Sequence, residues 1–196
     1  MKKGTKRLLL CCLLLLLAGL WVWRFVAVNR FYRELEENDG CDTEYYELGE
    51  TVVFGDNAIV KESVEGYTFR VDRVEITDYA PYDTEGIGPE DQMILVYATV
   101  GREAESDSPG VPLSELYLYG LENDFSMDYD ALNTINPGLN GANGISLPVG
   151  SSYDVILPYH AVKDYFSPET WAHLDEYELW LSTTGYFPTR KDIKVQ

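Results

Sequence analysis

The segment Met93-Ile-Leu-Val-Tyr-Ala-Thr-Val100 is apolar at almost every position. A strand with one face in water alternates apolar and polar residues, whereas a strand covered on both faces stays apolar along its length. We therefore predict a central β-strand at Met93–Val100, with other parts of the domain packed against both of its faces.

The residues before this strand predict a second strand that contains an irregularity. Apolar and polar residues alternate over Tyr67–Val71, and the alternation resumes in the opposite phase over Val74–Ile76. A β-bulge, which adds one residue to one strand of a pair, shifts the phase in this way. A bulge is therefore expected at Asp72–Arg73.

Strand and turn signals continue over most of the remaining chain. Gly55-Asp56-Asn57 and Glu122-Asn123-Asp124 each separate two short apolar runs and predict a hairpin. A short helix is expected where Ser167 can cap and Pro168 can occupy the first turn, continuing through Trp171–Leu174. The other strands are expected at Thr51–Phe54, Ala58–Lys61, Leu116–Leu121, Phe125–Asp128, Tyr153–Leu157, Tyr177–Ser182 and Ile193–Val195.

Many short strands, turns with Gly and Pro, and a single helix are typical of two packed antiparallel sheets. We therefore predict that residues 48–196 form a mainly β domain, an antiparallel immunoglobulin-like β-sandwich with one short helix.

The N-terminal region predicts a membrane anchor. Residues 8–23 are all apolar or glycine, and the apolar character resumes after Arg24 up to Val28. At about 1.5 Å per residue this length of helix crosses a bilayer. We predict a cytoplasmic tail at residues 1–7 and a single transmembrane helix at residues 8–28. The residues expected to anchor it in the lipid bilayer include Leu8, Leu13, Leu17, Trp21, Trp23 and Val28.

A cleaved signal peptide is the alternative interpretation of this region. Cleavage requires small residues one and three positions before the cut, but Ala18, Gly19 and Ala27 each have a large residue two positions earlier. A lipoprotein site is missing as well, because Leu20 stands where a cysteine is required. An uncleaved signal-anchor is therefore favoured. Four basic residues precede the run and three follow it, which predicts a cytoplasmic N-terminus and an extracytoplasmic body.

The charges of the chain are divided unevenly. Residues 1–33 hold seven of the 15 basic residues and no acid, so residues 34–196 carry all 33 acids with eight bases. Such a body is repelled by phosphate backbones and anionic lipid head groups, which argues against nucleic acid as a partner. Residues 29–47, which are polar and charged, are expected to form an acidic stalk.

Cysteine and asparagine usage indicate the compartment. Two of the three cysteines lie in the apolar run, so the body has no internal disulfide, and no asparagine stands in an Asn-x-Ser/Thr site. These features favour a bacterial surface protein over a eukaryotic ectodomain. Cys41 is expected to be a free thiol, with a link between two chains as the alternative.

Several segments follow the order of a known kind of domain. They are Leu48-Gly49-Glu50-Thr51-Val52, Tyr67–Val71 leading to Val74-Glu75, Met93–Val100, and Leu147-Pro148-Val149-Gly150-Ser151-Ser152 before Tyr153–Leu157. The region Leu48–Thr183 resembles the telokin-like, immunoglobulin-fold extracytoplasmic domains of unknown function found on Gram-positive bacteria. The chain departs from them in lacking a lipid-anchoring cysteine and in its predicted helix at Ser167–Leu174. The resemblance implies a surface domain and supplies no catalytic residues.

The sequence holds few groups for catalysis. His160 and His173 are the only imidazoles, and neither lies in a motif with a nucleophile. Zinc is not expected with these two histidines and one exterior cysteine. Two acidic groups could offer oxygen ligands to Ca²⁺, but their spacing differs from an EF-hand loop, and we interpret them as solvated. They are Asp124, Asp128 and Asp130, and Glu103, Glu105 and Asp107. We therefore expect no enzyme activity, no cofactor and no metal.

These observations lead to a functional hypothesis. We expect a membrane-anchored extracytoplasmic module that binds, senses or interacts with a cell-wall ligand or an extracellular or envelope protein. Recognition is expected in the loops Tyr79–Gln92 and Asn133–Ser146, because long loops on a rigid sandwich often carry binding sites. The alternatives are a carboxylate-based surface hydrolase and a structural subunit of an envelope complex. A concave site with two converging carboxylates and aromatic platforms for sugars would separate these hypotheses.

Overall fold

The computed structural model describes residues 23–24, 42–55, 58–59, 62–82, 88, 90–121, 123–139, 144–183 and 189–196. The chain divides into two units after Cys41, and the fold given below is that of Asp42–Gln196. Among the described residues, no helix has both the length and the apolar character needed to cross a membrane. The predicted span lies outside these residues except for Trp23 and Arg24, and so do Cys41 and the expected anchor residues Leu8, Leu13, Leu17, Trp21 and Val28.

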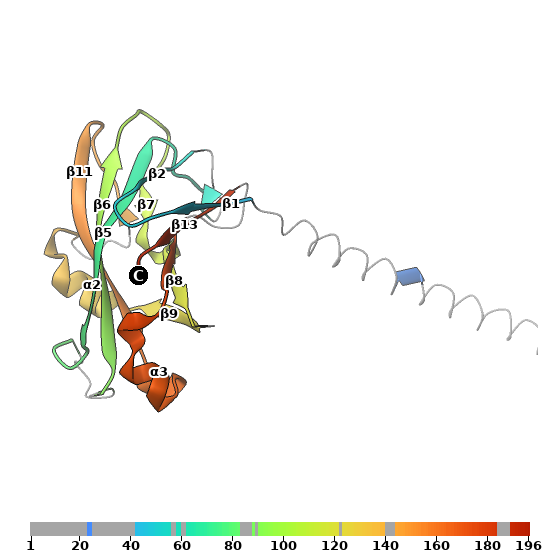
Figure 1. The fold of residues 1–196 in the computed structure, drawn as a ribbon. Coiled ribbons are helices and arrows are strands. Elements are labelled where there is room, and N and C mark those ends of the chain that lie inside the picture. The colour runs from blue at the N-terminus through green and yellow to red at the C-terminus, as the bar shows by residue number, and fades with distance from the viewer. Residues whose placement is uncertain are drawn as a thin grey trace, which may run out of the picture. The chain divides into compact units, whose positions relative to one another are not determined.

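The domain is built on one large β-sheet, and the mainly β prediction is confirmed (Figure 1). Its nine strands are hydrogen-bonded in the order β1-β13-β12-β8-β9-β11-β6-β5-β2. In Figure 1, β5, β6 and β11 stand opposite β8 and β13, so the sheet curves around a common core. The strands are β1 (Asp42–Tyr46), β2 (Thr51–Val53), β5 (Tyr67–Asp78), β6 (Gln92–Arg102), β8 (Tyr117–Gly120), β9 (Asn123–Met127), β11 (Ser151–Ala161), β12 (Trp180–Ser182) and β13 (Thr189–Lys194).

Shorter elements complete the described part of the domain. Two small sheets pair β3 (Ala58–Ile59) with β4 (Glu62–Ser63) and β7 (Val111–Pro112) with β10 (Gly144–Ile145). The α-helices are α2 (Tyr129–Ile135) and α3 (Pro168–Ala172). The 3-10 helices are η1 (Leu113–Glu115), η2 (Pro137–Leu139), η3 (Lys163–Tyr165) and η4 (Leu174–Glu176).

The prediction of an antiparallel immunoglobulin-like sandwich is wrong in two respects. β9 pairs with both β8 and β11, which joins the two layers into one sheet. β1 pairs in parallel with β13, so the sheet is mixed. The last part of the expected stalk (residues 29–47) is therefore a β-strand, β1, and not a spacer. Tyr46 packs on the core and Tyr45 meets the ring of Trp180 edge to face at 5.4 Å, which holds this polar segment in the sheet.

The predicted hairpin around Gly55-Asp56-Asn57 is also wrong. β2 pairs with β5, and β3 pairs with β4. Phe54, next to β2, is buried with its ring centroid 6.4 Å from that of Phe69 on β5. Burial of this apolar side chain against β5 explains why the segment joins the main sheet.

The first half of the central strand is covered on both faces, as predicted, whereas Tyr97 and Thr99 farther along it are partly exposed on the outer face. Ile94 and Val96 of β6 enter the main core, while Met93 and Leu95 point to the other face. There they form a second apolar cluster with Ala131 of α2. The prediction of a single helix is wrong because α2 exists: Asp128 caps it by accepting a hydrogen bond from the amide of Ala131 at 2.9 Å.

Three local predictions are confirmed. The register between β5 and β6 shifts between Val71 and Arg73, which places the bulge at Asp72. β8 and β9 form the second predicted hairpin, with Leu121 at a φ of 55° in its turn. α3 begins after Ser167, whose hydroxyl accepts from the amide of Thr170 at 3.1 Å.

Candidate functional site

A groove lies on the outer face of β5, β6 and β11. Its first lobe has a volume of about 580 Å³ and is walled on one side by the end of α2 and by η2. The strands contribute its floor. The first lobe is lined by Arg70, Asp72, Arg73, Tyr97, Ala98, Thr99, Ile135, Asn136, Pro137, Gly138, Tyr153, Asp154, Val155 and Ile156.

A second lobe extends the groove toward β2. It also has a volume of about 580 Å³, and Arg70 and Thr99 line both lobes, so the two meet at these side chains. The second lobe is lined by Thr51, Thr68, Arg70, Thr99, Gly101, Arg102, Glu103, Gly150, Ser151 and Ser152.

Strand register brings the polar floor together. Arg70 of β5 stands opposite Thr99 of β6, and Thr99 stands opposite Asp154 of β11. Because side chains of directly opposed residues lie on the same face, these three form a row across the sheet. The bulge then adds to the row, since Asp72 and Arg73 are consecutive and both exposed on the outer face.

Two carboxylates converge on one hydroxyl group in this row. The Thr99 oxygen lies 2.9 Å from Oδ2 of Asp72 and 3.0 Å from Oδ1 of Asp154. A threonine hydroxyl carries a single proton and can donate to one acceptor at a time. The other carboxylate oxygen must take a proton donor from solvent or from a bound molecule. The floor is therefore rich in acceptors at its centre.

Two arginines lie beside these acceptors. Arg70 donates from Nε to Oδ1 of Asp72 at 2.6 Å and is 44% exposed, so its planar group stays at the junction of the lobes. The guanidinium carbon of Arg73 lies 3.4 Å from the centre of the Tyr97 ring, and its Nη1 donates to Glu75 at 2.9 Å. This hydrogen bond, with a weaker contribution from the Tyr97 hydroxyl, lowers the pKa of Glu75. Both arginines are thus held in place as donors.

Asn136 fixes the wall of the first lobe to the floor. Its side-chain amide donates to the carbonyl oxygen of Ile156 at 2.7 Å, and its Oδ1 accepts from the amide of Ile156 at 2.8 Å. Asn136 therefore pairs with the edge of β11 as a strand residue would. Its Nδ2 also donates to the carbonyl of Leu132 at 2.9 Å, which ties the end of α2 to the same point.

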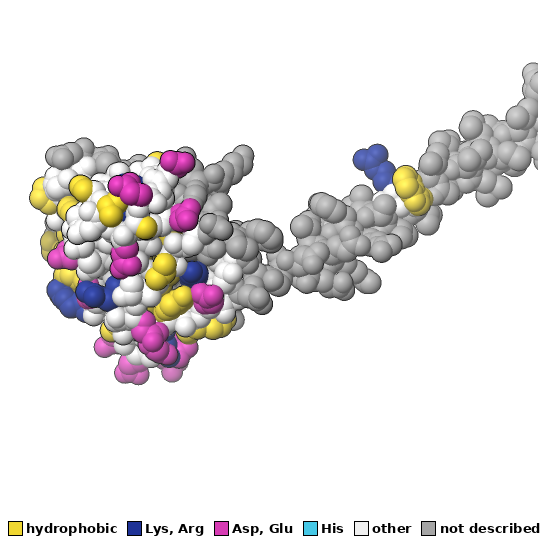
Figure 2. Space-filling view, turned by 90° about the horizontal axis from the view of Figure 1, so that it is seen from above, with side chains coloured by type: hydrophobic (Ala, Val, Ile, Leu, Met, Phe, Trp, Pro, Cys, Tyr) yellow, Lys and Arg dark blue, Asp and Glu magenta, His cyan; other side chains and the backbone are white. Residues whose placement is uncertain are grey.

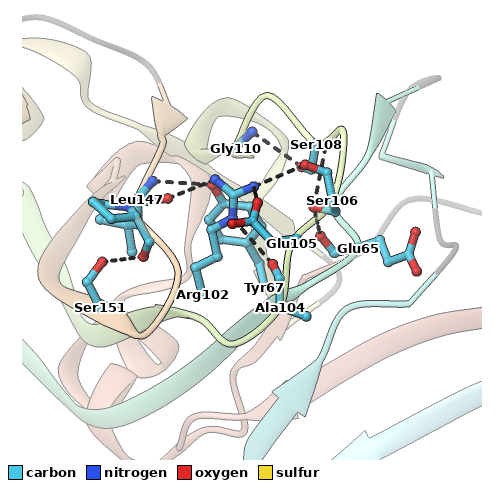
Figure 3. A network of polar contacts seen from close by, with 11 residues as sticks. Glu65, Tyr67, Arg102, Ala104, Glu105, Ser106, Ser108, Gly110, Leu147 and Ser151 are labelled. Atoms are coloured by element: carbon cyan, nitrogen blue, oxygen red, sulfur yellow. Dashed lines mark hydrogen bonds and ion pairs between the residues drawn. The ribbon is translucent and has the colours of Figure 1, made fainter.

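Arg102 organises the far end of the second lobe (Figure 3). Its guanidinium donates to the carbonyl oxygens of Leu147 at 2.8 Å, Ser106 at 3.0 Å and Ala104 at 3.4 Å. Figure 3 shows it between the two loops that these residues occupy. The Arg102 side chain is only 14% exposed, so we interpret it as a support of the groove.

The groove differs in charge from the rest of the acidic body. Figure 2 shows acidic side chains spread over one face of the domain. The groove, in contrast, is lined by equal numbers of opposite charges: Arg70, Arg73 and Arg102 with Asp72, Asp154 and Glu103. Three of the eight basic residues in residues 34–196 thus lie here.

Of the histidines and acidic residues considered for catalysis and metal binding, all within the described ranges, only Glu103 lines the groove. His160 contacts Asp91 (Nε2 to Oδ2, 2.8 Å) and stacks on Tyr79, with ring centroids 4.0 Å apart. In the described part of the chain no serine or cysteine hydrogen-bonds to His160. His173 is exposed and contacts Glu176 at 3.0 Å. We interpret His160 as a structural link between β11 and the segment after β5.

The acidic groups considered for Ca²⁺ have other roles or stay in solvent. Asp128 caps α2 and accepts from the Tyr79 hydroxyl at 2.9 Å, while Asp124 and Asp130 are exposed. Over the ranges that the structure describes, no group of three His, Cys, Asp or Glu side chains has the arrangement needed for a metal ion. Glu103, Glu105 and Asp107 follow β6 and are exposed.

The two loops expected to carry recognition differ in outcome. Asn133–Ser146 contributes Ile135, Asn136, Pro137 and Gly138 to the groove wall. Tyr79–Gln92 supplies no lining residue among its described positions. The floor residues of β5, β6 and β11 were missed as a site, because each reads as an ordinary solvent-facing strand position.

Comparison with known proteins identifies a family. A family model described as a domain of unknown function (DUF5028) matches residues 43–191. This range contains all the lining residues of both lobes. No curated protein and no solved structure matches the chain.

Proposed function

The chain belongs to the DUF5028 family, and we propose that it is a non-enzymatic, membrane-anchored binding module with its ligand site in the outer groove. The observation that carries the proposal is the convergence of Asp72 and Asp154 on the Thr99 hydroxyl in the floor of that groove. A concave surface with a few convergent polar groups on rigid strands is the usual form of a binding site.

The placement at the cell surface rests on the sequence. The apolar run at residues 8–28, with four bases before it, supports a bilayer anchor and an extracytoplasmic body. The excess of 33 acids over eight bases in residues 34–196 supports a body kept away from anionic lipid and nucleic acid. The strand pattern of Leu48–Thr183, which resembles telokin-like surface domains of Gram-positive bacteria, supports the same location, although the sheet is continuous and mixed where those domains have an immunoglobulin fold.

A carboxylate-based hydrolase is the second candidate, because two carboxylates face one groove. Glycoside hydrolysis needs one carboxyl that keeps its proton, which proteins achieve with apolar surroundings. Asp72 is paired with Arg70 at 2.6 Å and its side chain is 41% exposed, and Asp154 is exposed as well. These surroundings favour binding over acid catalysis.

A sedimentation assay tests the proposal. The full-length chain, solubilised in detergent, is mixed with purified envelope material of the host cell and centrifuged. We expect the protein to pellet with this material, and Thr99→Val to lower its affinity by about tenfold, because the substitution removes the hydroxyl shared by the two carboxylates. Asp154→Asn is a second variant that keeps the side-chain shape.

A matched control removes a hydroxyl outside the groove. Thr134 of α2 donates to the carbonyl oxygen of Asp130 at 2.8 Å on the exposed side of the helix. Thr134→Val is expected to pellet as the unmodified chain does. The proposal fails if the unmodified chain stays in the supernatant, or if both groove variants bind as well as this control. If the chain is instead a structural subunit of an envelope complex, it should pellet only when its partner, an envelope protein, is present in the pellet.

A further inference from the structure

We infer that the groove binds a neutral glycan and holds neighbouring hydroxyl groups of a sugar ring at Asp72, Thr99 and Asp154. This inference rests on the proposed function and names the ligand class of the same site. Four features of the groove carry it: its charge balance, its pattern of donors and acceptors, the use of side chains in its floor, and its length.

The charge balance favours a ligand without net charge. Three arginines and three carboxylates line the groove, although the body around it is strongly acidic. A polyanion would meet the repulsion of the surrounding acids, and a polycation would be attracted equally to many other parts of the surface. A neutral ligand is selected by the local geometry of the groove alone.

The donors and acceptors match adjacent hydroxyl groups. Arg70 donates to Oδ1 of Asp72, and the single Thr99 proton is shared between Oδ2 of Asp72 and Oδ1 of Asp154, so one of these two oxygens can take a further donor. Arg70 and Arg73 each hold one carboxylate, and their remaining N–H groups can donate to a ligand beside these carboxylates. A hydroxyl group donates and accepts at once, so two neighbouring sugar hydroxyls can donate to the carboxylates while their oxygens accept from the arginines.

The centre of the floor, which is β6, presents side chains and no free strand edge. β6 is hydrogen-bonded on both sides, to β5 and to β11, so its amide and carbonyl groups are used within the sheet. An extended peptide is usually recognised through a free strand edge, where backbone groups remain available. The centre of this groove lacks such an edge. Recognition through side chains suits a ligand that carries polar groups around its whole outline, as a sugar does.

The second lobe extends the site for a chain of sugars. Hydroxyl-bearing side chains continue from the junction at Arg70 and Thr99 toward β2, and Gly101 adds no side chain to the floor between them. The hydroxyl-bearing residues of this lobe are Thr51, Thr68, Thr99, Ser151 and Ser152. Because the lobes are continuous, we expect a glycan strand to occupy both.

Periodate oxidation tests the ligand class. Periodate cleaves the bond between carbon atoms that carry neighbouring hydroxyl groups, and borohydride then reduces the aldehydes so that they cannot react with lysines. Envelope material treated in this way is compared with mock-treated material in the sedimentation assay with the full-length chain. We expect oxidation to lower the affinity at least tenfold, and the affinity for mock-treated material to stay unchanged between 0.1 and 0.5 M NaCl, since the ligand is neutral.

A charge-matched control distinguishes the effect of a hydrogen-bond donor in the groove on affinity from the effect of the net charge of the domain. Arg70→Ala and Lys194→Ala each remove one positive charge that is paired with one carboxylate. Only Arg70 lines the groove, so only Arg70→Ala is expected to lower the affinity. Equal losses in both variants would overturn the inference.

The remaining outcomes distinguish the two proposals. Unchanged binding to oxidised material would refute the glycan while leaving a binding groove in place, with a peptide as its ligand. Binding that weakens strongly with salt would refute a neutral ligand. No binding to mock-treated material would refute the proposed function and, with it, this inference.

Discussion

Lys191 of β13 donates a hydrogen bond from Nζ to the carbonyl oxygen of Val53 on β2 at 2.6 Å. These strands lie near opposite ends of the nine-stranded order, so the contact joins the two ends of the curved sheet. Lys191 is buried, and its Nζ also lies 3.7 Å from Oε2 of Glu44 on β1. A single side chain therefore contacts both strands that bound the sheet.

Replacing Lys191 should weaken the contact between the two ends of the curved sheet. Lys191→Met keeps the length of the side chain but leaves the Val53 carbonyl without its donor, so we expect the free energy of unfolding to fall by about 1–3 kcal/mol. Urea denaturation measures this change, and amide hydrogen exchange should accelerate in β2. Lys194→Met, at an ion pair with a 63% exposed Glu178, should change stability by less than about 0.5 kcal/mol. Equal effects of the two substitutions would contradict the proposal that Lys191 holds the two ends of the sheet together.

Two glycines with the same backbone conformation should respond differently to alanine. Gly66 has a φ of 84° and Gly49 a φ of 87°, so both substitutions strain the backbone. A Cβ at Gly66 would lie 2.6 Å from the carbonyl oxygen of Ala104, whereas nothing lies within 4 Å at Gly49. We expect a loss of about 3 kcal/mol for Gly66→Ala and about 1 kcal/mol for Gly49→Ala. Thermal and urea unfolding would show whether the two losses differ.

The sequence predicted those parts of the fold that depend on local patterns. The phase change at Asp72 located the bulge, and the apolar run at Met93–Val100 located β6, whose first half is covered on both faces. Ser167 followed by Pro168 located α3. In each case the physical cause lies within a few neighbouring residues.

The elements that were missed depend on distant parts of the chain. β1 is polar along its length and becomes a strand because β13, far along the chain, pairs with it. The floor of the groove joins Asp72, Thr99 and Asp154, and Thr99 is separated by 27 residues from the first and 55 from the last. Strand register brings them together, and no pattern within one strand predicts the register of another. The segment Asn133–Ser146, expected as a recognition loop, instead holds the end of α2, η2 and β10 among its described residues, and its first part walls the groove.

Asn136 should contribute more to the free energy of unfolding than Asn133, which lies three residues earlier in α2. Asn136→Ala would leave both the amide and the carbonyl of Ile156 without their partner at the edge of β11, so we expect a loss of about 2–3 kcal/mol in the free energy of unfolding. Asn133 is exposed and donates to the carbonyl of Tyr129 within α2. Asn133→Ala is expected to change stability by less than about 0.5 kcal/mol. Similar values for both variants in urea denaturation would show that the hydrogen bonds between Asn136 and Ile156 do not stabilise the domain.

Alkaline pH should destabilise the domain through one buried and two partly buried tyrosines. Burial raises the pKa of Tyr159 and of Tyr119, and burial together with a hydrogen bond to Glu44 raises the pKa of Tyr46 to about 12. In the unfolded chain the pKa of a tyrosine is about 10. A raised pKa in the folded state favours the neutral phenol there, so this stabilisation is complete below about pH 10 and is lost as the pH rises toward the folded values.

Tyr159 provides the clearest test, since its side chain is 1% exposed and its hydroxyl donates to the carbonyl oxygen of Leu116 at 2.9 Å. Each tyrosine that ionises only on unfolding adds up to about 1.4 kcal/mol per pH unit to the decline in stability. Tyr159→Phe removes one such group, so its free energy of unfolding should fall less steeply between pH 10 and 12 than that of the unmodified domain, although it starts lower at pH 8. Tyr165→Phe, at a side chain that is 74% exposed, should leave the slope unchanged. Urea denaturation over pH 8–12 measures these slopes, and identical slopes for Tyr159→Phe and the unmodified chain would show that Tyr159 ionises without unfolding.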